Sequence, residues 1–94
     1  MHVKWLEVAL DSLIAEAEFI SQDGIAAAKQ SVEAILDAVE NLKRVPALGR
    51  PGRVAGTREL VVSGTPYIVP YRVRGDTVEL LLVLHAARRW PNHF

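Results

Sequence analysis

The sequence of 94 residues predicts an α+β fold, in which an N-terminal antiparallel helical hairpin packs on a small, mainly antiparallel β-sheet. In the first half of the chain, apolar residues recur at helical spacing. In the second half, short runs of alternating residues are separated by Gly and Pro. Half of all residues are hydrophobic, which is enough for one compact core in a single domain spanning residues 1–94.

The first half is expected to contain one short strand and two helices. The strand covers His2–Trp5, the first helix Glu7–Ser21 and the second helix Ile25–Arg44. Asp23 and Gly24 separate the helices, since this pair favours a turn. The residues expected on the two buried helix faces are Leu10, Leu13, Ile14, Ala17 and Ile20 in the first helix and Ile25, Ala28, Val32, Ile35, Leu36, Val39 and Leu42 in the second.

The second half is expected to supply the sheet that covers the hairpin. Its Pro and Gly content predicts a loop over Pro46–Gly52, and strands follow at Thr57–Val62, Tyr67–Arg74 and Thr77–His85. Gly75-Asp76 forms a tight hairpin turn between the last two strands. The N-terminal strand is expected to add to this sheet.

Two features of the last strands give finer expectations. The run Leu80–Leu84 is apolar without alternation, which predicts a central strand covered on both faces. Pro70 has no N–H, so part of the middle strand is expected at an edge or a bulge. Alternation places Arg72 and Arg74 on one face of that strand and Tyr71 on the other, against the helices.

The net charge of zero hides a strong asymmetry along the chain. Residues 1–42 hold eight acidic and two basic residues, a net charge of −6, whereas residues 43–94 hold nine basic and three acidic residues, a net charge of +6. Eight of those nine cations are Arg, which suits bidentate recognition of phosphate or carboxylate. Two interpretations stay open: the halves neutralise each other inside the fold, or the basic half meets an anionic partner.

Several classes of site and location are excluded or disfavoured. The chain has no Cys, so it has no disulfide, thiolate metal site or Cys nucleophile. His2, His85 and His93 lack the spacing of metal ligands, and neither a metal nor a cofactor is expected. The N-terminal segment has no uninterrupted apolar core and no stretch is long enough to span a membrane, so a soluble cytoplasmic protein is expected.

The order of elements and several motifs resemble the RelE/ParE superfamily of bacterial toxins. The motifs are the Pro-Ala-Leu-Gly-Arg loop at 46–50, Arg-Glu-Leu at 58–60, Tyr-Ile-Val-Pro-Tyr-Arg-Val at 67–73 and Val-Leu-His at 83–85. The resemblance runs from His2 to about Pro91. It implies the toxin of a type II toxin–antitoxin pair, often encoded on a plasmid, which arrests growth unless a cognate antitoxin binds it in a hetero-oligomer.

Two activities share this fold, and fold alone does not select between them. RelE-like members cut mRNA on the ribosome, whereas ParE-like members poison DNA gyrase. The concentration of Arg with one His at a strand end favours the ribosome-dependent mRNA interferase, with gyrase inhibition as the alternative. A toxin-fold binding module without activity is a further alternative.

Cleavage of RNA without a metal needs groups that move protons and cations that stabilise the phosphorane. The residues expected to supply this chemistry in one concavity are Arg58, Arg72, His85 and Arg88. The residues expected to bind the target or the antitoxin are Arg50, Arg53, Arg74, Arg89 and Trp90. Ala86 and Ala87 stand where RelE-like nucleases often place a cation, which weakens the nuclease interpretation.

A structural role is the alternative for each of these side chains. Arg72 could pair with Glu79, and Arg58 with Glu59. His85 could be a hydrogen-bonded residue at a strand end, and Trp90 a packing plug.

Overall fold

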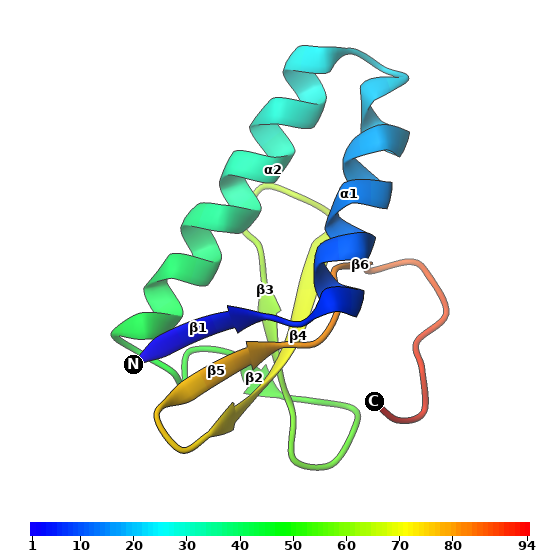
Figure 1. Cartoon of the computed structure of the whole chain (residues 1–94). Helices are drawn as coiled ribbons and strands as arrows, with labels where there is room; N and C mark the ends of the chain where they lie inside the picture. Colours follow the sequence, from blue (N-terminus) through cyan, green and yellow to red (C-terminus); the bar gives the residue numbers. More distant parts are fainter.

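The computed structural model describes all 94 residues, which form two helices packed against one face of a six-stranded sheet (Figure 1). The elements are β1 (His2–Trp5), α1 (Glu7–Ser21), α2 (Ile25–Glu40), the 3₁₀ helix η1 (Asn41–Lys43), β2 (Arg50–Pro51), β3 (Arg58–Val61), β4 (Tyr67–Arg74), β5 (Thr77–Leu80) and β6 (Leu84–His85). The predicted α+β class, with a helical hairpin on a mainly antiparallel sheet, is therefore confirmed.

The strands are ordered β1-β5-β4-β3-β2 across the sheet, and β6 pairs with the first part of β4. Only the β1–β5 pair is parallel; every other pair is antiparallel. The N-terminal strand thus joins the sheet at one edge, as the sequence predicts. β4 is the central strand, and its register with both neighbours decides which side chains share a face.

The strand predicted over Thr77–His85 is divided into β5 and β6, and the break lies beside Pro70. The Pro70 carbonyl accepts a hydrogen bond from the Leu81 N–H at 2.9 Å, so its backbone faces the segment between β5 and β6. Pro70 has no N–H to continue the ladder on that side. The expectation of an edge or bulge at this residue is confirmed as a bulge: between the pairs Tyr71–Leu80 and Ile68–Leu84, two residues of β4 lie opposite three residues, 81–83.

Three other boundaries differ from the prediction. α2 ends at Glu40 and the chain tightens into η1, instead of continuing as α-helix to Arg44. The loop predicted over Pro46–Gly52 contains the short strand β2, because Arg50 and Pro51 pair with the first two residues of β3. The strand predicted over Thr57–Val62 is one residue shorter at each end.

The turn between the helices depends on Gly24. Its φ is 133°, a conformation that residues with a side chain rarely adopt. It lies three residues after the end of α1 and directly before α2, so it lets the chain reverse and begin α2 at Ile25. α1 has the boundaries that the sequence predicts.

The core lies between the two helices and one face of the sheet. It is one cluster of 13 buried residues: Ala9, Leu13, Ile35, Val39, Leu42, Leu60, Val62, Tyr67, Val69, Tyr71, Val78, Leu80 and Val83. The predicted burial is wrong for four residues of the helices, because Leu10, Ile14, Ile25 and Leu36 are exposed. The sheet covers only one narrow stripe of each helix, and Ile25, in the first turn of α2, is 82% exposed. Neither helix combines the length and apolar content that crossing a membrane requires.

Candidate functional site

The face of the sheet turned away from the helices carries most of the predicted binding residues. Tyr67, Val69 and Tyr71 of β4 belong to the core under the helices, so alternation turns Arg72 and Arg74 to the opposite side. Residues paired across strands share a face. The pairings Arg72–Glu79, Lys4–Glu79, Glu59–Pro70 and Arg50–Glu59 therefore put Lys4, Arg50, Glu59 and Glu79 on this same side.

Glu79 binds two arginines on this face. Arg72 Nε donates to Glu79 Oε1 at 2.7 Å, and Arg74 Nε lies 3.4 Å from the same oxygen. The hydrogen bond from Arg72 is the main reason why the pKa of Glu79 lies below its ordinary value of 4.5, and the charges of Arg72, Arg74 and Lys4 lower it further. The structural alternative for Arg72 is confirmed, since it pairs with Glu79.

The lowered pKa of Glu79 predicts a specific change in stability with pH. A carboxylate whose folded pKa is depressed stabilises the fold above its unfolded pKa, and this contribution is lost as pH falls from about 4.5 through the folded value. We therefore expect Glu79→Gln to lose less stability than the wild type in urea titrations between pH 5 and pH 3. Glu33→Gln, which alters an exposed carboxylate 4.0 Å from Lys29, is the control. Parallel curves for Glu79→Gln and the wild type would contradict this prediction.

Glu59 binds a second pair of arginines and is only 3% exposed. Its Oε1 accepts from Arg50 Nε at 3.1 Å and Nη2 at 3.0 Å, and its Oε2 accepts from the Arg53 backbone N–H at 2.9 Å. The Arg53 guanidinium also lies 4.0 Å from the centre of the Trp90 ring, in a cation–π contact. Arg50 and Arg53 thus hold an internal carboxylate as well as facing solvent.

Arg58 does not pair with Glu59, so that structural alternative is wrong. Its register partner is Tyr71, which places it on the helix-facing side of the sheet. Arg58 Nη1 donates to the carbonyl of Gly49 at 2.8 Å and that of Ala47 at 3.4 Å. Arg58 is therefore a positioning residue for the loop before β2.

His85 lies opposite Tyr67 in the sheet and meets its ring edge-on, with the ring centres 5.7 Å apart. His85 Nδ1 accepts a hydrogen bond from the Ala87 N–H at 3.1 Å. The imidazole therefore makes contacts typical of a structural residue at a strand end.

Arg88 binds Glu16, a buried carboxylate on α1 that the sequence analysis did not single out. Arg88 Nη1 lies 3.0 Å from Glu16 Oε1, and the Tyr67 hydroxyl donates to Glu16 Oε2 at 3.2 Å. Burial is the main cause of the raised pKa of Tyr67, and the adjacent Glu16 adds to it. The signal for Glu16 was its spacing, because it shares the buried stripe of α1 with Ala9 and Leu13.

The expected convergence of the four catalytic candidates does not occur. Arg72 lies on the open face of the sheet, whereas Arg58 and His85 lie on the helix-facing side, and Arg88 reaches back to α1. The sheet separates the proposed proton carrier from Arg72. The physical reason is register: Leu84 pairs with Ile68, which puts the next residue, His85, on the other side.

The remaining predicted residues lie in the C-terminal segment. Arg89 is exposed and makes no ion pair or side-chain hydrogen bond. Trp90 is half-buried against Arg53, and its Nε1 is buried without a hydrogen-bond partner. A packing role for Trp90 agrees with this position.

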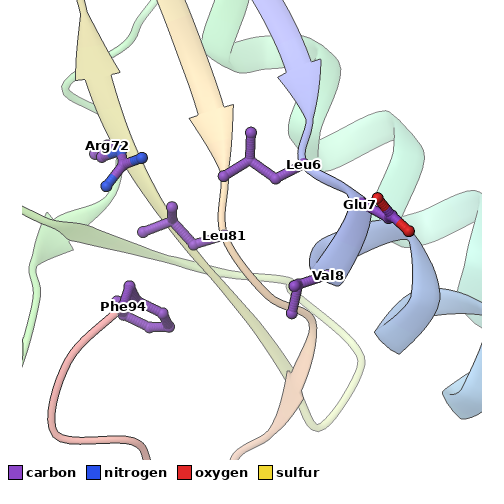
Figure 2. A pocket seen from close by; sticks show the side chains of 6 residues that line it. All are labelled: Leu6, Glu7, Val8, Arg72, Leu81 and Phe94. Carbon is purple, nitrogen blue, oxygen red and sulfur yellow. The ribbon is translucent and has the colours of Figure 1, made fainter.

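The C-terminal Phe94 borders a mainly apolar pocket of about 280 Å³ on the open face (Figure 2). Its lining residues are Leu6, Glu7, Val8, Arg72, Leu81 and Phe94. The pocket lies between the start of α1 and the ends of the central strands, with Arg72 at one side. It could take an apolar group next to a cation.

The acidic and basic halves do not neutralise each other. A single ion pair, Arg88–Glu16, joins a helix to the residues after η1; the other pairs lie within the helical segment, within the sheet-forming segment, or between His2 and Asp76 at the sheet edge. Most acidic side chains therefore stay on the hairpin, and five of the basic ones, Lys4, Arg50, Arg53, Arg72 and Arg74, lie on or beside the open face.

Comparison with known proteins gives the family. The family model described as "ParE toxin of type II toxin-antitoxin system, parDE" matches residues 3–90. A candidate toxin of Sinorhizobium fredii, Y4kP, is 45% identical over 89 residues, which cover 95% of this chain and 92% of the relative. The chain belongs to the ParE toxin family.

A solved structure agrees with this membership. The chromosomal ParDE toxin–antitoxin system from P. aeruginosa matches with a TM-score of 0.82 and 30% sequence identity, covering 88% of this chain and 92% of that one. The chain is thus a toxin of the type II toxin–antitoxin class with the ParE fold.

Proposed function

We propose that this ParE-family toxin arrests growth by inhibiting DNA gyrase in the cytoplasm and is held inactive by a cognate antitoxin. The observation that carries the proposal is the match to the ParE family over residues 3–90, which covers both helices and every strand except the first residue of β1. Inhibition of a protein target needs a surface rather than a set of proton-transfer groups. This requirement fits a chain whose candidate catalytic side chains are engaged in internal contacts.

The mRNA interferase, which the sequence favoured, has less support. Cleavage by that route needs a proton carrier and cations around one phosphate. His85 and Arg72 lie on opposite faces of the sheet, and Arg58 is occupied by the carbonyls of its own loop. We therefore favour the gyrase alternative over cleavage on the ribosome.

Pulse labelling after induction of the chain alone tests the target in cells. We expect thymidine incorporation to fall first and cells to filament, while methionine incorporation continues, because gyrase inhibition blocks DNA synthesis before translation. An immediate collapse of methionine incorporation would contradict the proposal and favour the ribosome. Normal growth with full-length protein present would favour an inactive binding module.

The antitoxin is proposed to cover apolar side chains that the fold leaves exposed. Leu10, Ile14 and Leu36 each expose more than two-fifths of their surface, on the helical hairpin, and Ile25 is exposed at its tip. With Val8 and Phe19, they make six exposed large apolar side chains on the two helices, which is typical of a surface that a partner covers. We place an apolar segment of the antitoxin along α2, and an acidic segment at the basic edge of the sheet.

Binding of the antitoxin is expected to raise the melting temperature of the chain. At a free antitoxin concentration 100-fold above Kd, linkage adds about 2.7 kcal/mol to the free energy of unfolding, or about 10–20 °C for a domain of this size. Differential scanning fluorimetry measures this shift, and Leu36→Ser should reduce it. An unchanged melting temperature at saturating antitoxin would contradict the proposed partnership.

A further inference from the structure

We propose that the open face of the sheet binds the phosphodiester backbone of nucleic acid. We call this surface the cationic face and define it by Lys4, Arg50, Arg53, Arg72 and Arg74. These residues come from β1, β2, β4 and the loop after β2, and the fold brings them to one side of the sheet. The inference does not depend on gyrase being the target, since it concerns direct binding of nucleic acid.

The cationic face has an excess of positive charge. Its five cations surround the carboxylates of Glu59 and Glu79, and Glu7 borders the same face at the pocket beside Arg72, which leaves a net charge of +2. Glu16, the hairpin carboxylate that pairs with Arg88, is buried beside Tyr67 on the helix side of the sheet, so this link between helix and basic segment is not on the cationic face. An approaching polyanion thus meets positive charge on this side of an overall neutral protein.

The two carboxylates orient the guanidinium groups instead of merely neutralising them. Glu79 pairs with the Nε atoms of Arg72 and Arg74. Glu59 Oε1 pairs with Nε and Nη2 of Arg50. The remaining terminal N–H groups are free to donate. Arg74 is 66% exposed, so its free donors reach solvent. Fixed, planar guanidinium groups suit bidentate contact with phosphate oxygens.

The spacing of the two carboxylate-centred clusters favours a ligand with repeated charges. Glu59 lies opposite Pro70, and Arg72 is two residues further along β4, a diagonal separation of about 7–8 Å across the sheet. The residue of β4 that lies between the two clusters is Pro70, which is buried. On this face Trp90 adds an aromatic ring stacked on Arg53, as surfaces that follow a nucleic-acid backbone often do.

On the cationic face, as distinct from the sheet edge assigned to the antitoxin's acidic segment, an acidic peptide is the less favoured ligand. The backbone groups of β4 and β5 are already paired within the sheet, so a peptide could not add a strand between them. Pro70, the side chain between the clusters, is buried and offers no apolar anchor there, and the apolar pocket beside Arg72 has room for one apolar side chain only at the end of α1 and β5. A phosphodiester chain needs neither strand addition nor an apolar anchor, because cationic side chains bind its phosphate charges.

Fluorescence anisotropy with the full chain tests the proposal. The probes are a labelled 20-base-pair DNA duplex and a single-stranded RNA of the same length, titrated between 50 and 200 mM NaCl in the absence of any other protein. We expect a slope of log K against log salt of about −3 to −4 for the duplex, because each phosphate contact contributes about −0.9. The DNA and RNA arms identify which nucleic acid the face prefers, and salt-dependent binding of either supports the proposal.

Matched charge variants assign the binding to this face. Lys4→Gln with Arg74→Gln should weaken binding and reduce the magnitude of the slope by about 2. Lys29→Gln with Arg44→Gln removes the same charge from the helical segment and should leave the slope unchanged. Arg74→Lys should retain most of the binding. Circular dichroism and melting curves verify that both double variants are folded.

Three outcomes would overturn the proposal. The first is the absence of salt-dependent binding to either probe at 50 mM NaCl. The second is equal weakening by the two double variants, which would mean that no particular face is used. The third is competition by poly-glutamate as strong as by unlabelled nucleic acid at equal charge, which would make the face a general acceptor of acidic chains.

Discussion

Tyr71→Phe is expected to lower the free energy of unfolding by about 2–4 kcal/mol. The Tyr71 hydroxyl donates to the carbonyl of Pro46 at 2.7 Å and accepts from the N–H of Gly49 at 2.8 Å. The side chain is fully buried in the core, so removing one oxygen leaves two backbone groups without their partner. The loop that leads into β2 loses the contact that holds it on β4.

Urea unfolding at pH 7 measures this effect, and a double-mutant cycle with Arg58→Ala tests the cause. Arg58 binds the carbonyl of Gly49, so the two side chains hold the same loop and their effects should not be additive. Gly49→Ala should be destabilising as well, since a Cβ there would lie 2.6 Å from Tyr71 Cε1 and 2.9 Å from the Glu59 carbonyl oxygen. A change within 0.5 kcal/mol for Tyr71→Phe would show that the hydroxyl does not hold the loop.

Arg88→Ala is expected to cost about 2–3 kcal/mol because it leaves the Glu16 carboxylate without its cation. Glu16 is 6% exposed and its remaining partner is the Tyr67 hydroxyl. Breaking a buried pair by removing one partner usually costs more than this. Arg88 is 52% exposed, however, so solvent already screens part of the interaction.

The neighbouring Arg89 is a matched control for Arg88. It carries the same charge one residue later and makes no ion pair, so Arg89→Ala should change stability by less than 0.5 kcal/mol. Adding Glu16→Leu to Arg88→Ala should recover much of the loss, because it removes the unpaired buried charge. If Arg88→Ala and Arg89→Ala were equally mild, the link between the C-terminal segment and α1 would not stabilise the fold.

The elements of the fold could be predicted because their signals are local. Helical spacing and Gly24 gave both boundaries of α1 and the start of α2, and alternation gave β4 to the residue. The division of the last strand could not be predicted, since it depends on which residue faces Pro70 across the sheet. The exposure of Leu10 and Ile14 likewise depends on how much of each helix the sheet can cover.

The arrangement of the site depends on the register between strands, whereas the prediction from sequence used only the alternation of side chains along one strand. Arg58 and Glu59 are adjacent in a strand and therefore point to opposite faces, so their pairing could have been excluded from alternation alone. The separation of Arg72 from His85 needed the pairing of β6 with β4, which no local pattern shows. Arg72–Glu79 was predictable, because a tight hairpin turn places them opposite each other.

The central claim is that this ParE-family toxin acts on DNA gyrase, and purified components test it most directly. The chain is added to gyrase, ATP and relaxed closed-circular plasmid, and the products are separated on agarose gels with and without detergent. We predict loss of supercoiling together with accumulation of cleaved plasmid that appears when detergent is added, and reversal of both by the antitoxin. Full supercoiling at a large molar excess of folded chain over gyrase would contradict the account.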